Sequence, residues 1–496
     1  MRLSKLLSLI REYVTYENIS KDIEITDLCE DSRYSEINQN TLFFAIEGSK
    51  VDATKFIPEL IERGCRTFIA SKPVEISDKN INIVVVNNIR RVQAIVSKHF
   101  FGKPDEKLKV LGVTGTKGKT TISYMIFNAL RGIGMKGGLI GTIEYKIDDS
   151  SIPAENTTPG PLQIYTLLSD IVNNSGEFVS MEVSSHGLET ERVYGVKFDV
   201  GVFTNLSREH LDFHKDMESY FNAKMKLFHN IKLHNPEGTA VINIDTEWGN
   251  RAYEIAKNLG LRTITCSIKN TADIIARDIT ISIDGNRFTI ECNGKSYKAK
   301  TKMAGLHNVY NAICSLGAVL SVADENKIPE VIEHIGETTV KGRFQVIKSN
   351  RGFFVAIDYA HTPDSLEKTL ETGRTFSPTR LTVVFGAGGD RDRGKRPLMG
   401  EVAVKLADKV IITSDNPRTE NPTNIIMDIL SGISEDGMRK VKVIEDRRKA
   451  INTALKEAIE GELIIIAGKG HEEYQIIGTQ KLHFSDIEEV TKSEYF

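Results

Sequence analysis

The sequence is poor in cysteine, and its few cysteines form no metal-binding or disulfide pattern. The 496 residues contain five cysteines, an odd number, and no two of them stand in a Cys-Xaa-Xaa-Cys pair. A disulfide framework or a structural zinc site would require paired or closely spaced cysteines. We therefore expect reduced thiols in a cytoplasmic protein. The five positions are Cys29, Cys65, Cys266, Cys292 and Cys314.

Long apolar runs and a strong excess of one charge are absent too. No stretch approaches the roughly 18 consecutive apolar residues that a membrane-spanning helix needs. The formal net charge is −3, whereas a nucleic-acid-binding protein normally shows a basic patch or stripe. Neither an internal repeat nor a low-complexity tract occurs. These absences predict a globular protein with no nucleic-acid partner and no membrane insertion.

The N-terminus begins with an apolar stretch that could be mistaken for a signal peptide. This stretch is short, and no small-residue cleavage site follows it. Its apolar side chains fall on one helical face, which predicts a helix packed on the core. These side chains are Leu3, Leu6, Leu7, Ile10 and Val14.

The length predicts about three domains, because 496 residues exceed what one core holds. Strand-like segments alternate with helix-like ones, which predicts an α/β fold with mostly parallel sheets. Gly102-Lys103-Pro104-Asp105 interrupts this alternation, and a polar helix-like segment runs from Asp324 to Val340. We predict domains over residues 1–104, 105–340 and 341–496.

Residues 108–121 have the pattern of a phosphate-binding loop. An apolar run from Leu108 to Val113 meets a glycine-rich turn, and a helix-like stretch follows from Thr120. Amides at such a helix N-terminus favour anions, the lysine reaches terminal phosphates, and the threonine hydroxyl binds Mg²⁺. The strict motif has glycine where Val113 stands, and an ordinary glycine-rich turn is the alternative. The residues predicted to bind ATP here are Gly115, Thr116, Lys117, Gly118, Lys119, Thr120 and Thr121.

Two further strands of the central segment end in side chains suited to metal or substrate. The strand from Phe178 ends in Glu182 and a Ser-Ser-His turn, and the strand from Phe198 leads to His210. The carboxyl ends of parallel strands are where α/β sheets bind ligands, and a carboxylate suits Mg²⁺. The alternatives are a glutamate facing water and a structural histidine. Lys224, in a helix-like stretch, has the pattern of a solvated side chain.

The C-terminal segment contains the same pattern, an apolar strand followed by a polar turn, three times. Apolar strands at Leu381–Phe385, Val410–Thr413 and Leu463–Ala467 each lead into a polar turn. We predict a parallel sheet on whose ligand-binding edge these turns meet. The turn after Phe385 lacks the glycine pattern of a dinucleotide fingerprint, and its four basic residues favour a carboxylate or phosphate.

These motifs resemble the Mur ligase family along nearly the whole chain. The resemblance implies an N-terminal α/β domain for the uridine diphosphate substrate, a central P-loop-type ATPase and a C-terminal Rossmann-like domain. It implies Mg²⁺ bound by Thr120, Glu182, His210 and a carbamylated Lys224, with Lys119, Lys224 and His210 catalytic. Further ATP contacts would be Asn308 and Arg343. The muramoyl-peptide contacts would be Ser32, Asn156, Thr157, Thr158, Ser184 and Arg192. The amino-acid contacts would be Arg391, Asp415, Asn416, Pro417, Arg418, Gly468 and Glu472.

The implied reaction is ATP-driven ligation of an amino acid to UDP-N-acetylmuramoyl-L-Ala-D-Glu in peptidoglycan precursor synthesis. Independently of the resemblance, we expect a monomer. Family members that add meso-diaminopimelate tend to read Asp-Asn-Pro-Arg at positions 415–418, as this chain does. A guanidinium can grip the distal carboxylate that distinguishes diaminopimelate from lysine. Lysine or lanthionine remains an alternative for the added residue.

Three other functions stay open. One is a ligase of the same superfamily with another substrate, such as a folylpolyglutamate synthetase. A nucleotide-dependent switch or motor would need loops that sense the γ-phosphate and a partner surface. A catalytically silent binding protein would not require Lys119, Glu182, His210 and Lys224 together.

Overall fold

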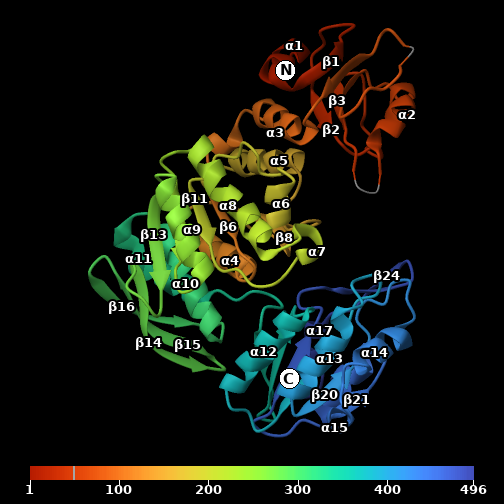
Figure 1. The fold of residues 1–496 in the computed structure, drawn as a ribbon. Coiled ribbons are helices and arrows are strands. Elements are labelled where there is room, and N and C mark those ends of the chain that lie inside the picture. The colour runs from red at the N-terminus through yellow and green to blue at the C-terminus, as the bar shows by residue number, and fades with distance from the viewer. Residues whose placement is uncertain (49–50, 77) are drawn as a thin grey trace. The chain divides into compact units, whose positions relative to one another are not determined.

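The computed structural model describes residues 1–48, 51–76 and 78–496, which form two compact units. Unit 1 comprises Met1–Asp273 and Cys314–Val331, and unit 2 comprises Ile274–Ile313 and Ile332–Phe496. The predicted α/β class is confirmed, because three regions of helix-flanked sheet follow one another along the chain (Figure 1). No helix in the described part of the chain is long and apolar enough to cross a membrane.

The N-terminal region of unit 1 is a five-stranded sheet in the order β1-β5-β4-β3-β2, parallel except for β1. Helix α1 packs its apolar face on this sheet, as predicted, with Leu3, Leu6 and Ile10 fully buried. It ends at Leu9, and Val14 begins β1 instead. The elements are α1 (Leu3–Leu9), β1 (Val14–Asn18), β2 (Asp27–Cys29), β3 (Thr41–Ala45), α2 (Ile57–Glu62), β4 (Thr67–Ala70), β5 (Asn82–Val86) and α3 (Ile89–Phe100).

The central region of unit 1 is a sheet in the order β13-β12-β11-β6-β10-β7-β8-β9, parallel from β13 to β7. Its strands are β6 (Lys109–Thr114), β7 (Gly137–Ile140), β8 (Glu144–Ile147), β9 (Ser150–Pro153), β10 (Phe178–Glu182), β11 (Val200–Phe203), β12 (Thr239–Asn243) and β13 (Arg262–Ser267). Its helices are α4 (Lys119–Gly132), α5 (Pro161–Asn173), α6 (Ser185–Glu189), α7 (Leu211–His214), α8 (Met217–His234) and α9 (Glu247–Asn258).

Strand register aligns the ends of the three central strands. Glu182 of β10 pairs with Val113 of β6, and Phe203 of β11 pairs with Thr114 of β6. The turns that follow these strands therefore leave the sheet at one edge, where α/β proteins bind ligands.

Unit 2 contains an antiparallel meander and a six-stranded sheet. The meander comprises β14 (Ile274–Ser282), β15 (Gly285–Cys292) and β16 (Lys295–Thr301), and lies outside the predicted pattern. The sheet order is β17-β18-β22-β19-β20-β21, parallel except for β17. Its strands are β17 (Gln345–Lys348), β18 (Phe354–Asp358), β19 (Leu381–Phe385), β20 (Lys409–Ile412), β21 (Val441–Val443) and β22 (Leu463–Ala467), and β23 (Tyr474–Ile477) pairs with β24 (Gln480–His483).

The remaining elements are helices. Those of unit 2 are α12 (Pro363–Thr375), α13 (Lys395–Leu406), α14 (Pro422–Leu430), α15 (Glu435–Met438), α16 (Arg447–Lys456) and α17 (Asp486–Thr491). Two helices contain residues of both units, namely α10 (Leu306–Leu320) and α11 (Ile328–Glu337). Short 3₁₀ turns are η1 (Arg11–Tyr13), η2 (Ala53–Phe56), η3 (Pro104–Glu106) and η4 (Glu325–Lys327).

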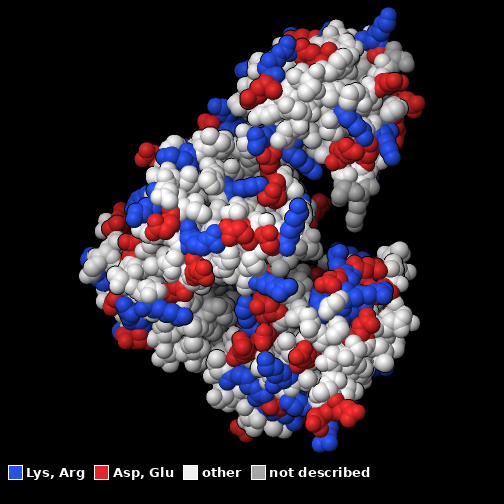
Figure 2. Space-filling model, in the orientation of Figure 1, with Lys and Arg blue, Asp and Glu red and all other residues white. Residues whose placement is uncertain are grey.

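The three polar turns of unit 2 meet at one sheet edge, as predicted. Gly389, after β19, donates its N–H to the Asn416 carbonyl oxygen at 2.9 Å. Lys469, after β22, donates from Nζ to Oδ1 of Asn416 at 3.0 Å. On the face shown in Figure 2, basic and acidic side chains are interspersed rather than gathered by sign.

Candidate active site

The predicted phosphate loop has backbone angles that require glycine. Gly115 and Gly118 have φ angles of 146° and 90°, and a Cβ added to Gly115 would lie 1.9 Å from Oγ1 of Thr204. Lys119 begins α4, and its Nζ donates to the carbonyl oxygens of Gly115 at 2.9 Å and Thr116 at 3.0 Å. The loop therefore holds its lysine at a helix N-terminus, where an anion is favoured.

Two residues at the end of β11 brace this loop, and sequence reasoning did not single them out. Oγ1 of Thr204 donates to the Lys117 carbonyl oxygen at 2.7 Å, and the Lys117 N–H donates to Oδ1 of Asn205 at 3.0 Å. The Thr116 N–H donates to the carbonyl oxygen of Asn205 at 2.9 Å. The signal for both was their place directly after a buried strand.

Glu182 is a buried carboxylate beside the loop. Glu182 is only 1% exposed, so the alternative of a glutamate that faces water is excluded. It accepts hydrogen bonds from Oγ1 of Thr120 at 3.0 Å and from the Thr142 N–H at 2.7 Å. A buried carboxylate favours a cation, and Mg²⁺ takes one or two protein carboxylates together with phosphates, so Thr120 and Glu182 fit this ion.

Protein ligands alone do not form a closed metal cage here. In residues 1–48, 51–76 and 78–496, no group of three or more His, Cys, Asp or Glu side chains is arranged to hold a metal ion. An open arrangement suits Mg²⁺, which usually keeps several waters and substrate oxygens among its ligands.

Lys224, in α8, is buried rather than solvated. It is 1% exposed, its Nζ donates to the Gly115 carbonyl oxygen at 2.9 Å, and it lies 4.3 Å from the centroid of the Tyr220 ring. Burial, followed by the charge of Lys119, holds the pKa of Lys224 well below its ordinary value. A lowered pKa favours the neutral amine, which is the form that reacts with CO₂.

His210 lies near the same loop. It is exposed, with a φ of 58°, and its ring centroid is 6.1 Å from that of Tyr220. Tyr220 in turn contacts the loop, because Oγ1 of Thr116 donates to its hydroxyl at 3.2 Å.

Glu209, the neighbour of His210, was not singled out from the sequence. It pairs with Lys117 at 3.3 Å. Burial alone would raise the pKa of Glu209, but nearby lysine charges hold that pKa below its ordinary value.

Five residues predicted to contact the muramoyl peptide lie in the segment after β9 and in the turns that follow β10. Oγ1 of Thr158 donates to the Glu182 carbonyl oxygen at 2.9 Å and accepts from the Ser184 N–H at 2.9 Å. Nη1 of Arg192 donates to the Thr158 carbonyl oxygen at 2.8 Å. Burial, followed by the charge of Arg90, lowers the pKa of Arg192. The five are Asn156, Thr157, Thr158, Ser184 and Arg192.

Ser32 lies in the N-terminal region of unit 1, after β2, and its carbonyl oxygen accepts from Arg63. Glu30, two residues earlier, accepts from Nε2 of Gln93 at 2.8 Å. A Cβ added to Gly160 would lie 3.4 Å from Oε1 of Glu30. The segment that contains Ser32 therefore approaches the turn that begins at Asn156.

In unit 2, the predicted amino-acid contacts gather opposite charges after β20 and β22. Nδ2 of Asn416 donates to Oε2 of Glu472 at 3.0 Å. The half-buried Arg418 donates from Nη1 to the Gly389 carbonyl oxygen at 2.8 Å. Burial, followed by the charge of Asp415, raises the pKa of Glu472. The cluster thus offers a guanidinium to a carboxylate and two carboxylates to an ammonium.

Three further predicted contacts lie on the same turns. Gly468 has a φ of 116°, and a Cβ added there would lie 3.1 Å from Oδ2 of Asp415. A Cβ added to Gly389 would lie 1.9 Å from the Pro417 carbonyl oxygen. Arg391 is exposed on the turn after β19. The absence of a side chain at Gly389 and Gly468 therefore lets these turns approach one another closely.

Asn308 and Arg343, predicted for ATP, both lie in unit 2. Asn308 is fully buried, where its Nδ2 donates to the Ala304 carbonyl oxygen at 2.7 Å and its Oδ1 accepts from Asn311 at 2.9 Å. The guanidinium of Arg343 lies 4.7 Å from the centroid of the Tyr359 ring. Asn308 is thus engaged in hydrogen bonds that organise the start of α10.

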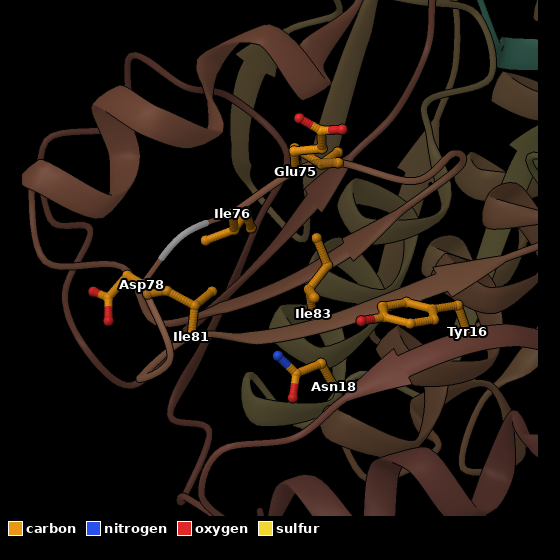
Figure 3. A pocket seen from close by; sticks show the side chains of 8 residues that line it. Tyr16, Asn18, Glu75, Ile76, Asp78, Ile81 and Ile83 are labelled. Carbon is orange, nitrogen blue, oxygen red and sulfur yellow. The ribbon is translucent and has the colours of Figure 1, made fainter.

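A cavity of about 330 Å³ lies apart from these groups, and none of the predicted site residues lines it (Figure 3). Its lining combines apolar and acidic side chains from β1, from β5 and from the segment before β5. The lining residues are Tyr16, Asn18, Val74, Glu75, Ile76, Asp78, Ile81 and Ile83.

Comparisons with known proteins cover nearly the whole chain. The Mur ligase middle domain matches residues 113–319, and the Mur ligase glutamate ligase domain matches residues 342–470. A UDP-N-acetylmuramoyl-L-alanyl-D-glutamate--2,6-diaminopimelate ligase of Clostridium tetani is 41% identical over 494 residues, which is 98% of each chain. Another of that name, from Caldanaerobacter subterraneus subsp. tengcongensis, is 42% identical over 469 residues and 94% of each chain. A solved structure of a ligase with this name is 33% identical, with a TM-score of 0.68 and 94% of each chain covered.

Proposed function

Because this chain belongs to the Mur ligase family, we propose that it is an ATP-dependent ligase of peptidoglycan precursor synthesis. It adds meso-diaminopimelate to the D-glutamate of UDP-N-acetylmuramoyl-L-Ala-D-Glu and releases ADP and phosphate. The names of these relatives state the addition of 2,6-diaminopimelate for those proteins.

The chemistry proceeds through an acyl phosphate, because a carboxylate is a poor electrophile. The γ-phosphoryl group of ATP passes to the γ-carboxylate of D-glutamate, and ADP leaves. The amine of diaminopimelate then attacks the acyl carbon and loses a proton, and inorganic phosphate departs as the amide forms. Such reactions ask the protein mainly for alignment and charge neutralisation. The position of Lys119 on the phosphate loop supports its role in neutralising the transferring group.

We assign the Mg²⁺ ligands to Thr120, Glu182, His210 and carbamylated Lys224. Bound Mg²⁺ supplies positive charge that offsets the repulsion between phosphates and the attacking carboxylate. In carbamylation, the neutral Lys224 amine bonds to the carbon of CO₂ and releases a proton. This turns a buried amine into an anionic oxygen ligand. The lowered pKa of Lys224 supports this assignment.

The observation that carries the choice of amino acid is the set of opposite charges at the turns of unit 2. Arg418 suits the distal carboxylate, because a planar guanidinium can make two parallel hydrogen bonds with it. Glu472 takes the distal ammonium, and Arg391 takes the carboxylate beside the reacting amine. L-Lysine would leave Arg418 without a carboxylate.

The test is phosphate release from ATP and UDP-muramoyl dipeptide, measured with a panel of amino acids. We expect release only when all three substrates are present, with meso-diaminopimelate giving the highest kcat/KM among diaminopimelate, lanthionine, L-lysine and L-glutamate. A preference for L-lysine would contradict the amino-acid assignment alone. Hydrolysis without the two acceptor substrates would favour a switch or motor, and activity with a folate and L-glutamate would favour a folylpolyglutamate synthetase.

Three organisational features belong to this proposal as well. The protein acts in the cytoplasm as a monomer, and its domains divide near residues 104 and 340. Light scattering should give the mass of one 55.3 kDa chain, and limited proteolysis should cut first near the two divisions. A dimer mass, or first cuts elsewhere, would refute the corresponding part.

A further inference from the structure

Lys469 is a buried cation at the centre of the turns that gather the amino-acid contacts. Its side chain is 0% exposed. Its Nζ lies 3.0 Å from Oδ1 of Asn416 and 2.6 Å from the Tyr474 carbonyl oxygen. It also lies 3.4 Å from Oδ1 of Asp415 and 3.8 Å from Oε2 of Glu472. One ammonium therefore touches three of the predicted amino-acid contacts without facing solvent itself.

These contacts fix the orientation of the Asn416 amide. Its Oδ1 accepts hydrogen bonds from Lys469 and from the Ile476 N–H, each at 3.0 Å. An ammonium and a backbone N–H can only donate, so the atom that faces them must be the amide oxygen. Its Nδ2 faces the Glu472 carboxylate at 3.0 Å. A flipped amide would set N–H groups against an ammonium and an oxygen against a carboxylate. Asn416 can therefore offer a ligand only its remaining N–H, which suits a carboxylate.

Lys469 also balances the charge of this cluster. Asp415 and Glu472 supply two negative charges, and Lys469 and Arg418 supply two positive ones. Oδ1 of Asp415 is buried and has no hydrogen-bond donor among the described residues. A ligand end that carries both an ammonium and a carboxylate leaves this balance undisturbed. Without the lysine charge, the cluster would be negative and would favour an end that carries only an ammonium.

We propose that Lys469 is a positioning residue that determines specificity, because it locks Asn416 as a hydrogen-bond donor and neutralises one of the two carboxylates. Through both effects, it directs selection toward an amino acid with a zwitterionic distal end. This inference rests on the proposed function, since it concerns the same amino-acid site. It assigns a role to a residue that touches the recognition groups rather than the substrate.

The test compares kcat/KM for meso-diaminopimelate and for L-lysine in Lys469→Met, Asn416→Asp and the native protein. In Lys469→Met, we expect the diaminopimelate-to-lysine ratio to fall at least ten-fold, mostly through KM for the amino acid, with KM for ATP unchanged. Asn416→Asp keeps the size of the side chain but removes the locked donor, and its ratio should fall as well. If Lys469→Met does not fold, Asn416→Asp decides the question alone.

Arg380→Met is the matched control. Arg380 pairs with the buried Glu462 at 2.6 Å, and these residues precede β19 and β22, at the opposite end of the same sheet. This variant should lose thermal stability but keep the native substrate ratio. Equal losses on both amino acids in Lys469→Met, or an unchanged ratio in Asn416→Asp, would overturn the inference. A native preference for L-lysine would instead show that the proposed function is wrong.

Discussion

Replacing Arg418 by alanine should convert a selective enzyme into one that barely distinguishes diaminopimelate from lysine. The change removes the guanidinium and leaves the turn intact, because main-chain bonds hold residue 418 from both sides. Its N–H donates to the Ile476 carbonyl oxygen, and its carbonyl oxygen accepts from Gly478 at 2.7 Å. The φ of 52° is left-handed for arginine and alanine alike, so backbone strain is nearly unchanged.

The size of the effect follows from the partial burial of Arg418. Truncating one member of a buried charge pair costs roughly 2–5 kcal/mol. The side chain is only half-buried, and one of its donors is already used by Gly389, so the lower limit applies. About 2 kcal/mol corresponds to roughly thirty-fold in kcat/KM at about 1.4 kcal/mol per decade. Diaminopimelate should lose this factor, whereas L-lysine, which has no distal carboxylate, should change by less than about threefold.

The assay is coupled phosphate release with each amino acid varied at saturating ATP and UDP-muramoyl dipeptide. Arg418→Lys should fall between the native protein and Arg418→Ala, because lysine keeps the charge and loses the two-pronged geometry. Thermal unfolding of all three proteins checks that the fold is kept. Equal losses on diaminopimelate and lysine in Arg418→Ala would refute the reasoning, since a merely structural arginine would affect both substrates alike.

Three further outcomes are expected. Lys119→Ala should abolish ATP turnover and leave the thermal unfolding temperature unchanged, because the lysine charge is needed to neutralise the transferring phosphate. Near-normal turnover would exclude the phosphate-loop assignment. Lys224→Ala should lose most activity, with partial rescue by a short carboxylic acid and none by bicarbonate; full activity in protein whose Lys224 is an unmodified amine would disprove the carbamate. Hydrogen bonds from Arg396 hold the pKa of Glu420 at about 2. The ionised carboxylate therefore stabilises the fold fully at pH values above its ordinary pKa, and this stabilisation is lost as the pH falls toward 2. Glu420→Gln should therefore lower the unfolding temperature at pH 7, and the difference from the native protein should shrink on acidification; a constant difference would argue against the pair.

Local sequence patterns were sufficient for much of the fold. The apolar, β-branched runs at Leu381–Phe385 and Leu463–Ala467 are strands with those bounds. The glycine-rich turn before Lys119 is followed by a helix, as predicted. The meander of β14 to β16 was missed, although Asp284-Gly285 and Asn293-Gly294 are the turn pairs that hairpins favour. The signal of β16 is weak, because Tyr297 and Ala299 are its only apolar residues.

The site was predictable in its motifs but not in its burial. Lys224 has the pattern of a solvated helix residue, and only its contact with Gly115, 109 positions away in sequence, makes it a buried amine. Lys469 stands in the polar turn after Leu463–Ala467, yet its role depends on Asn416, 53 positions earlier. Such contacts arise from the sheet order, which brings distant strand ends together, and no local pattern encodes them.

Neither compact unit is an uninterrupted piece of chain, and this has a consequence for how the protein emerges from the ribosome. Unit 1 is completed by Cys314–Val331, which are synthesised after the first forty residues of unit 2. A nascent chain that has reached only Asp273 lacks Cys314, whose thiol contacts the buried Cys266 on β13. Part of the central sheet therefore stays exposed to solvent until residue 331 has left the exit tunnel. A protein truncated after Asp273 should be prone to aggregation. A protein truncated after residue 331 keeps the segment Cys314–Val331 and should aggregate less.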